Sequence, residues 1–358
     1  MFERIHIIIF LMIFVSCKTN SQQGNINKKT LYSDLDHEHS IPTEKFFSKI
    51  EVIPLETQEK SIIRGIDKIM EYQSCIYILD RRQKAVLIFD GHGKFISKIN
   101  SIGRAPDEFY ILEDIEINTF RNTLECLDPM GKILTYDLMG NYLSTIYLPH
   151  PPMAYHYLHV LNQDSILLYT NPTRDNDYTF RIFSRQQDTI ITQFSKQKKI
   201  ITGECKLPVQ KYTFPQKLLY KGYQGLNEFI DICRNNQYIW GHINVFEYKD
   251  MFFSLFNYNK ALYLNITNKT NKESTSYTKI YDDLVTNEKL ELTQLIQIGN
   301  NTKYCFFYIE PFELLEIIDT KKQKNTYAEY REKFQNNCHF IEKLNLDSNS
   351  ILVLLEKK

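Results

Sequence analysis

The amino-acid sequence predicts an all-β fold, a six-bladed β-propeller built from four-stranded antiparallel blades. The first observation is composition, because the chain holds 24 Tyr and 23 Phe, and aromatic residues favour strands. The second is an internal repeat, in which Phe89, Tyr136 and Phe183 occupy the same place in segments spaced 47 residues apart. A repeating four-stranded unit of roughly 40–50 residues is typical of a propeller blade. The third is a strand-like run near each end of the chain, and the two together complete one blade.

The N-terminal segment predicts export. Residues 1–16 read as a signal peptide, because a charged start precedes the apolar run Ile7–Val15. Such a run spans about 14 Å as a helix, far less than the ~30 Å core of a bilayer. The motif Phe14–Cys17 resembles the lipobox of bacterial lipoproteins, with Phe14 in place of the preferred Leu. The resemblance implies cleavage before Cys17 and lipidation of Cys17, whereas in an ordinary secretory signal Cys17 is incidental.

Residues 17–44 are mostly polar and predict a lipid-anchored flexible tether. The anchor implied by Cys17 places the protein on the outer membrane. The tether lacks the acidic run that is associated with transport to the cell surface in Bacteroidetes-like lipoproteins. The sequence therefore leaves both the periplasmic and the surface face open.

The repeat defines the strands of the first blades. Each segment is a strand, a turn and a strand, and Asp and Gly residues serve the turns because they cap N–H groups and accept positive φ. The three segments are Leu87–Ile99, Leu134–Ile146 and Arg181–Gln193. Further strands precede them at Ile63–Ile69, Cys75–Asp80, Leu112–Ile117, Thr123–Asp128 and Ser165–Tyr169. Four strands per repeat form one blade, and neighbouring blades bury each other's faces.

The rest of the chain predicts degenerate blades and a short helical insertion. Strand-like runs lie within Gln237–Asn265 and Ile296–Ile318, and Tyr327–Leu344 has helical character. The run Phe46–Leu55 has no partner nearby in the sequence, so we expect it to pair with the final run Asn349–Leu355 and close the ring. The propeller then covers residues 45–358, with six blades and seven as the alternative.

Several motifs resemble those of the six-bladed β-propeller lipoproteins of Bacteroidetes, which are distant relatives of NHL-type propellers. The motifs are Ile53–Thr57, Ile76–Asp80, Phe89-Asp90 with Gly93–Ile96, and Gly103–Phe109. Two glycines of the family's inter-blade loop are replaced by Ala105 and Asp107, and its closing Asn-Pro is Asn349-Ser350. The resemblance implies fold and cellular address, and it implies no shared chemistry.

The loop Gly103–Phe109 is the first candidate binding region. Arg104, Asp107 and Glu108 are candidates for the mouth of the central channel, where propellers commonly bind ligands. The alternative is structural: the loop shapes the passage between blades, and Arg104 pairs with Glu108.

Carboxylates on predicted inner strands are the second candidate. Asp67, Asp114 and Glu116 are expected to line the channel, either as solvated walls or as oxygen ligands for Ca²⁺. The H-x-x-H motif of His156 and His159 lies in a predicted strand, where positions i and i+3 face opposite ways, so we expect no metal site there. The sequence contains no G-x-S-x-G, Walker loop or H-E-x-x-H motif, and predicts no cofactor.

The remaining candidate residues are the cysteines and two Asp-Ser/Thr-aliphatic triplets. Apart from Cys17, the cysteines are Cys75, Cys126, Cys205, Cys233, Cys305 and Cys338, whose pairing the sequence leaves open. Cys75 and Cys126 lie in strand-like runs and are expected to be free buried thiols. The triplets at Ser165 and Thr189 resemble O-glycosylation acceptors of Bacteroidetes, and they also fit ordinary Asp-Ser/Thr turns that lead into strands.

The charge balance limits the function. The 43 Lys+Arg residues equal the 43 Asp+Glu residues, which argues against a nucleic-acid partner. We expect a membrane-anchored, non-enzymatic propeller that binds a ligand, a peptide or an envelope protein. The alternatives are a metal-dependent lactonase- or lyase-type propeller enzyme, and a scaffold subunit of an envelope uptake or secretion assembly.

Overall fold

The computed structural model describes residues 40–42, 47–149, 154–170, 178–196, 239–248, 250–258, 261–271, 273–282, 288–291, 304–329 and 338–357. The chain divides into two compact units. The first unit is Asn100–Ile201 with Met1–Thr30, and the second is Leu31–Ile99 with Thr202–Lys358. Each unit is described separately below.

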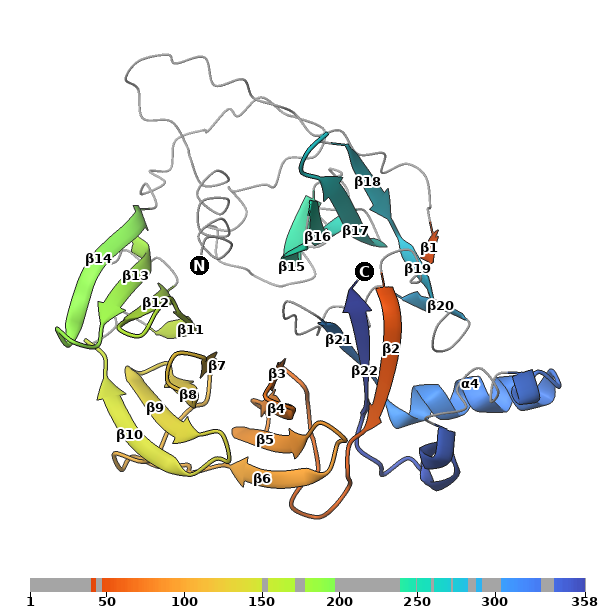
Figure 1. Cartoon of the computed structure of the whole chain (residues 1–358), viewed down its shortest axis with the longest axis horizontal. Coiled ribbons are helices and arrows are strands. Elements are labelled where there is room, and N and C mark those ends of the chain that lie inside the picture. Colours follow the sequence, from red (N-terminus) through yellow and green to blue (C-terminus); the bar gives the residue numbers. More distant parts are fainter. Residues whose placement is uncertain are drawn as a thin grey trace, which may run out of the picture. The chain divides into compact units, whose positions relative to one another are not determined.

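The first unit contains two four-stranded antiparallel sheets, each with its strands in chain order (Figure 1). One sheet holds β7 (Asp114–Asn118), β8 (Thr123–Asp128), β9 (Lys132–Asp137) and β10 (Tyr142–Tyr147). The other holds β11 (Tyr155–Val160), β12 (Ser165–Thr170), β13 (Tyr178–Ser184) and β14 (Thr189–Lys196). The hairpins predicted at Leu134–Ile146 and Arg181–Gln193 are confirmed as β9–β10 and β13–β14.

The second unit contains sheets of the same kind and shorter ones. One four-stranded sheet holds β3 (Lys68–Tyr72), β4 (Cys75–Asp80), β5 (Ala85–Asp90) and β6 (Phe95–Ile99), and another holds β15 (Ile239–Tyr248), β16 (Met251–Tyr258), β17 (Ala261–Asn268) and β18 (Ser274–Tyr277). A three-stranded sheet joins β2 (Phe47–Pro54), β22 (Ile351–Lys357) and β21 (Tyr304–Ile309), and another joins β1 (Ser40–Pro42), β19 (Lys279–Asp282) and β20 (Glu288–Glu291). All-β architecture built mostly from four-stranded antiparallel sheets is therefore confirmed.

The turns of the repeat are built around aspartates. The carboxylate of Asp90 accepts hydrogen bonds from the N–H groups of His92 and Lys94, both at 2.9 Å, and Gly93 has φ +82°. Asp137 and Gly140, with φ +91°, repeat this arrangement between β9 and β10. The aspartate carboxylate accepts backbone hydrogen bonds, and the glycine adopts positive φ without strain, so the chain reverses direction at low energetic cost, as the sequence predicted.

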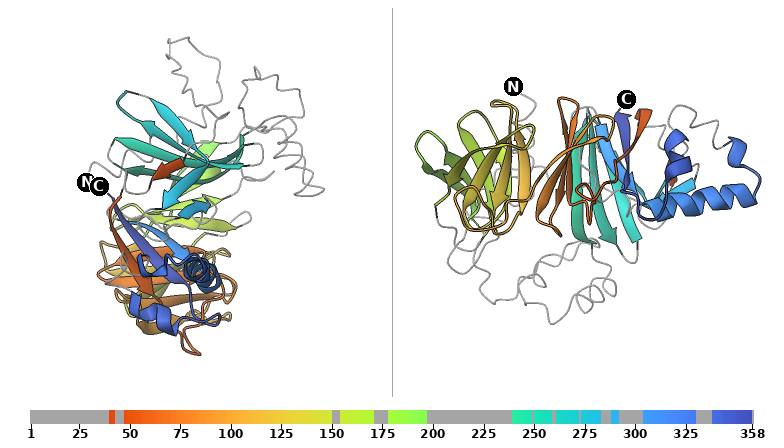
Figure 2. Two further views of the ribbon diagram at one scale, coloured as in Figure 1. Left: turned by 90° about the vertical axis from the view of Figure 1, so that its right-hand side faces the viewer. Right: turned by 90° about the horizontal axis from the view of Figure 1, so that it is seen from below.

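The pairing predicted between the two ends of the propeller sequence is present. β2 and β22 run antiparallel from Phe47 opposite Lys357 to Pro54 opposite Ile351, and they lie side by side in both views of Figure 2. Asn349, which is buried, strengthens the contact ahead of β22: its Nδ2 donates to two backbone carbonyls at 2.8 Å and its Oδ1 accepts from the N–H of Ile63 at 2.9 Å. This explains the asparagine of the family-like Asn349-Ser350 motif.

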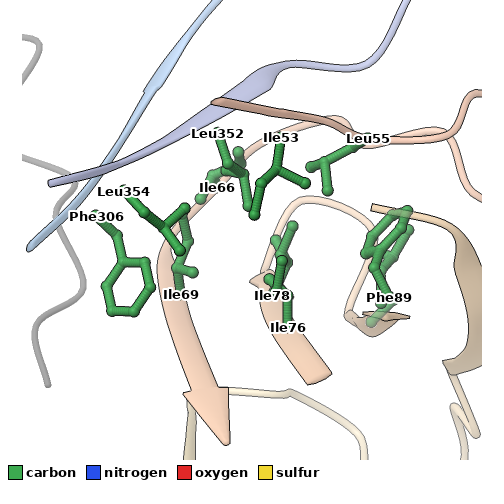
Figure 3. Packing of buried hydrophobic residues seen from close by; sticks show 12 residues of the cluster. Ile53, Leu55, Ile66, Ile69, Ile76, Ile78, Phe89, Phe306, Leu352 and Leu354 are labelled. Carbon is green, nitrogen blue, oxygen red and sulfur yellow. The ribbon is translucent and has the colours of Figure 1, made fainter. Parts of the chain in front are cut away.

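An apolar cluster packs this three-stranded sheet against β3–β6. Figure 3 shows Ile53 and Leu352 facing Ile76, Ile78 and Phe89. Each of these side chains is buried, and Leu352 and Phe89 are completely inaccessible to solvent. We call this contact the apolar seam of the second unit.

Two predictions about elements near the ends were wrong in their bounds. The helix α4 spans Pro311–Gln323, inside the run expected to be a blade, and the expected insertion holds the 3₁₀ helix η3 (Cys338–Lys343). Pro311 suits a first helical turn, and the Glu313 carboxylate accepts from the Glu310 N–H at 3.4 Å, so local signals start the helix early. Ser40–Pro42, expected in the tether, forms β1 and pairs parallel with β19.

Some sequence predictions concern residues outside the described part of the chain. These include Cys17, the signal peptide, Cys205 and Cys233. Cys75 and Cys126 are free thiols, as expected, but Cys126 is buried whereas Cys75 is only partly buried. Burial raises the pKa of each. Among the described residues, no helix is long and apolar enough to cross a bilayer.

Candidate binding site

The candidate site lies where the two sheets of the first unit meet. β7 and β11 are the first strands of their sheets, and two carboxylate–imidazole pairs join them. Glu113 Oε1 is 3.2 Å from His156 Nδ1, and Glu116 Oε1 is 2.9 Å from His159 Nδ1. An ionised carboxylate only accepts hydrogen bonds, so each Nδ1 carries the proton and each imidazole is held in one orientation.

A β-bulge in β11 allows both imidazoles to reach β7. The register pairs Tyr155 with Thr170 and Tyr157 with Tyr169, so β11 has one extra residue at this point. That residue, His156, breaks the strict alternation of faces along the strand. The expectation that His156 and His159 face opposite ways assumed an unbroken pleat, and the bulge shows that assumption to be wrong. The expected absence of a metal site at these histidines stays a prediction.

A buried ion pair lies deeper in the same contact. Glu125 is completely buried, and its two carboxylate oxygens accept from Nη2 of Arg185 at 2.5 and 2.6 Å. Asn118 Nδ2 adds a third hydrogen bond to Glu125 Oε1 at 2.8 Å. Nε of Arg185 is buried and has no hydrogen-bond partner among the described residues. We call the whole contact between the two sheets the charged seam.

Two of the three glutamates of the charged seam oppose each other. Glu116 on β7 pairs directly with Glu125 on β8, and opposed side chains of one face lie about 5 Å apart at Cβ. Two like charges at this spacing repel, and each is offset by a different cationic or hydrogen-bonding group of the next sheet. Glu125 is offset by Arg185 and Glu116 by His159.

The matching pair in the first repeat is apolar or uncharged. Met70 of β3 pairs with Tyr77 of β4, at the positions that correspond to Glu116 and Glu125. The carbonyl contacts support this alignment, because Asp67 N donates to Leu79 O just as Glu113 N donates to Leu127 O, both at 2.9 Å. A blade therefore folds without these glutamates, and the charged seam needs a reason beyond sheet formation.

Exposure decides which groups of the seam can meet a ligand. The side chain of His159 is 51% exposed and that of His156 is 27% exposed, while Glu125 is inaccessible. With each Nδ1 occupied by a carboxylate, Nε2 is the ring atom left to accept a hydrogen bond or a proton. The described residues contain no group of three or more His, Cys, Asp or Glu side chains arranged to hold a metal ion.

The three carboxylates predicted to line the channel have different partners in the structure. Asp114 is buried and accepts from the Leu158 N–H at 3.0 Å, so it ties β11 to β7. Asp67 precedes β3 and accepts from the Arg81 N–H at 2.8 Å. Of the three predicted carboxylates, Glu116 joins the candidate site, and the other two bind backbone amides.

The backbone of the predicted channel-mouth loop is held by hydrogen bonds to side chains. Lys132 Nζ donates to the carbonyls of Ala105 and Glu108 at 2.8 and 3.0 Å. Glu108 Oε2 accepts from the Ala105 N–H at 2.8 Å, and no ion pair joins it to Arg104 among the described residues. The Arg104–Glu108 pair expected in the structural alternative was therefore wrong, while Arg104 and Asp107 are exposed.

The two predicted modification sites differ in access. Ser165 is half-buried at the start of β12, and Thr189 is exposed at the start of β14, after Asp188 with φ +52°. Asp164 accepts from Ser184 Oγ at 2.8 Å, and this bond helps to hold its pKa below the usual range. Modification at either residue stays a prediction, and Thr189 is the better exposed of the two.

These sheets and their order along the chain define an all-β fold built mostly from four-stranded antiparallel sheets. Residues 26–223 match the family described as "Domain of unknown function (DUF4934)", and the chain belongs to that family. A comparison with curated proteins found no match.

Comparison with solved structures shows the fold alone. The chain is similar to a Bacteroides fragilis protein named as predicted to be exported, at 16% identity and a TM-score of 0.66, covering 91% of this chain and 99% of that one. A DUF4221 family member from Bacteroides vulgatus matches at 8% identity and a TM-score of 0.46, covering 87% and 97%. The Dos1 propeller matches at 10% identity and a TM-score of 0.28, covering 68% and 53%. We draw no argument from the last two.

Sequence reasoning missed most members of the site. Glu113, Glu125 and Arg185 were not predicted, and the pairing roles of His156 and His159 were missed as well. The available signal was the acidic strand Glu113–Glu116 followed 43 residues later by the H-x-x-H motif, close to the repeat length. Matching positions of consecutive blades are neighbours, so this spacing could have placed the acids beside the histidines.

Proposed function

We propose that this protein is an exported lipoprotein, anchored through Cys17 to the outer membrane, whose propeller binds a ligand without transforming it. The ligand contacts the two oriented imidazoles of His156 and His159. The resemblance to NHL-type lipoprotein propellers supports the proposed address.

One observation carries the binding role. Glu113 and Glu116 orient two imidazoles at a partly exposed edge, in a place where the corresponding strands of the first repeat form a sheet without such groups. Burying charged groups costs free energy, so their presence favours a role in binding over a role in folding.

The chemistry of the edge favours a ligand rich in hydrogen-bonding groups. The imidazoles offer Nε2, and Tyr157, 53% exposed, adds an aromatic ring beside them. Tyr157 continues into an aromatic row with Tyr169 at 5.6 Å between ring centroids. A peptide or an oligosaccharide presents both the polar groups and the apolar faces that such an edge binds.

Six blades in a closed ring are part of the proposal. Support comes from the six sheets formed by the described residues and from the pairing of β2 with β22, which joins the two ends of the propeller sequence in one sheet. Blade closure by chain ends removes free sheet edges and gives the fold its stability.

Binding arrays test the proposed role. The labelled full-length chain is applied to arrays of peptides and of oligosaccharides, alongside His156→Ala and His159→Ala. We expect a set of ligands whose signal falls at least about tenfold in both variants. His92→Ala, in the exposed turn after β5, is the matched control and should leave the signal unchanged. Signals that both seam variants retain would overturn the proposed site.

The anchor has its own test. Cells fed a labelled fatty acid should incorporate the label into the wild-type chain and lose it in Cys17→Ala. Protease treatment of intact cells then separates the periplasmic from the surface face. Secretion of an unlabelled wild-type chain would show that Cys17 is incidental to an ordinary signal.

The enzyme and scaffold alternatives predict different results. A metal-dependent lactonase- or lyase-type enzyme requires a stoichiometric metal ion, with Ca²⁺ as the first candidate, in the purified chain. A scaffold subunit requires a stable envelope partner that co-purifies in stoichiometric amount. Either result would replace the simple binding role.

A further inference from the structure

A rigid loop of the first unit presents a mixed polar and aromatic surface apart from the charged seam. We call it the docking patch, and it consists of Arg104, Asp107, Tyr110, Met130, Tyr142 and Tyr147. The loop that bears Arg104 and Asp107 runs between Ile102 and Phe109, which form an isolated parallel bridge. Phe109 is completely buried and fixes the end of the loop in the core.

Side chains from β9 and β10 hold the backbone of this loop. Lys132 Nζ donates to the carbonyls of Ala105 and Glu108, and Thr145 Oγ1 donates to Pro106 O at 2.6 Å. Glu108 also leaves no room for a side chain at Gly103, because a Cβ there would lie 1.9 Å from Glu108 Oε2. The positions of Arg104 and Asp107 are thus set before any partner arrives, which lowers the entropy cost of binding.

The other members of the patch are gathered around the loop by shared partners. Asp128, which is buried, accepts from the N–H groups of Tyr110 and Met130 at 2.7 and 2.9 Å, so these two residues are neighbours. Tyr147 pairs with Lys132 across β10 and β9, and therefore lies on the sheet face that the loop covers. Tyr142 Oη lies 3.1 Å from Thr145 Oγ1, the group that holds Pro106.

The exposure of these side chains is high for residues of their size. Tyr110 and Met130 are each 54% exposed, and Tyr147 is 57% exposed. Tyrosine, methionine and arginine are the residue types enriched at protein interfaces. The patch therefore has the composition of a surface that binds protein.

The two charges of the loop identify the partner. Within the described part of the chain, the side chains of Arg104 and Asp107 form no ion pair and no hydrogen bond. They have opposite signs, stand three residues apart on one fixed loop, and flank exposed aromatic side chains. A surface that carries both charges is complementary to itself when a twofold axis brings each Arg104 opposite the Asp107 of the other molecule. We propose that a second copy of this chain docks on the patch, forming a twofold-symmetric dimer through reciprocal Arg104–Asp107 pairs.

The small size of the patch limits the expected affinity of the dimer. Stable interfaces involve about 20–30 residues a side, far more than the patch offers, so we expect a dissociation constant in the micromolar range. Confinement of tethered molecules to one surface raises their effective concentration, which makes a weak interface sufficient there.

A reciprocal charge exchange tests the proposal independently of the proposed ligand site. Sedimentation velocity is run on the full-length chain in a non-ionic detergent, from about 1 to about 100 µM. The variants are Arg104→Asp, Asp107→Arg and the double exchange Arg104→Asp/Asp107→Arg. Each single variant places like charges opposite each other in the dimer, so we expect its dissociation constant to rise at least about tenfold. The double exchange restores both pairs and should return the dissociation constant to within about threefold of wild type.

Two controls accompany the experiment. Arg121→Asp changes an exposed arginine of the same unit outside the patch and should leave dimerisation unchanged. Circular dichroism confirms that each variant is folded. A wild-type chain that stays monomeric throughout, or a dimer equally strong in all four proteins, overturns the proposal. A dimer that both single variants weaken and the double exchange fails to restore also overturns it, because the charges then act without meeting each other.

Discussion

The apolar seam of the second unit and the charged seam of the first perform the same task with opposite chemistry. In the second unit, Ile53, Leu352 and Phe89 interlock between two sheets, and all three are buried. In the first unit, an apolar cluster that includes Leu127 and Phe183 also joins two sheets. There, however, Glu125 and Arg185 are buried beside it. Both contacts bury apolar side chains, and the charged seam adds a buried ion pair.

The difference between the two seams shows what apolar burial and a buried ion pair each contribute to the packing of two sheets. Apolar burial contributes about 25 cal/mol per Å² and needs no exact partner geometry. A buried ion pair recovers its desolvation cost only when its geometry is good and its other hydrogen bonds are made. The second arrangement thus specifies one partner sheet and one register, and it places Glu116 and His159 at a defined edge.

The largest expected effect comes from breaking the buried ion pair. Arg185→Met should destabilise the first unit by about 3–5 kcal/mol, because Glu125 would stay buried without its counter-charge. The measurement is hydrogen exchange of the β8 amides, since local opening reports the unit in which the change lies. The double variant Glu125→Met/Arg185→Met should recover most of the loss. Equal losses in the single and double variants would mean that packing, and not charge, explains the effect.

A smaller effect is expected in the apolar seam. Leu352→Ala should destabilise the second unit by about 3 kcal/mol, because it leaves a cavity beside Ile53 and Ile78. Hydrogen exchange of the β22 amides measures it. The loss should be the same at low and at high salt, because the substitution removes packing and no charge. A salt-dependent loss in Leu352→Ala would contradict the distinction between the two seams.

The smallest effect concerns the one carboxyl near the apolar seam whose pKa is raised. Burial raises the pKa of Glu310, and its Oε2 accepts from Ser350 Oγ at 3.0 Å. The folded state then binds the proton more tightly than the unfolded state, so the ionised carboxylate costs stability at neutral pH and this cost disappears as the pH falls below the unfolded pKa.

Glu310→Gln removes that cost while keeping an acceptor for Ser350. We expect the variant to be more stable than wild type at pH 7, by less than about 1 kcal/mol because the group is half exposed, and the gap to close near pH 4. Thermal unfolding at the two pH values checks this. A stability difference between the variant and wild type that widens on acidification would contradict this expectation.

Much of the fold was predictable because it depends on residues that are close in sequence or regularly spaced. Asp90 and Gly93 form the turn that their types predict, and the 47-residue spacing places Phe89, Tyr136 and Phe183 in equivalent buried positions. The pairing of β2 with β22 followed from counting strands, since a strand without local partners needs a distant one. The start of α4 was missed because Pro311 and Glu313 were read within an expected strand run.

The candidate site was only partly predictable. Glu116 was recognised from its place on β7, but Asp67 and Asp114 bind backbone amides, a use that sequence does not distinguish from lining a channel. His156 was set aside because a strand alternates its faces, and the bulge that changes its direction depends on how β11 pairs with β12.

By itself, the sequence determined the repeat, most of the strands and the turn residues, because each depends on neighbours within a few positions or on a regular spacing. Only the tertiary structure decided that Glu125 meets Arg185 and that Glu116 meets His159, because those partners lie 60 and 43 residues apart. Electrostatic pairing depends on distance in space, and a chain position alone does not fix that distance.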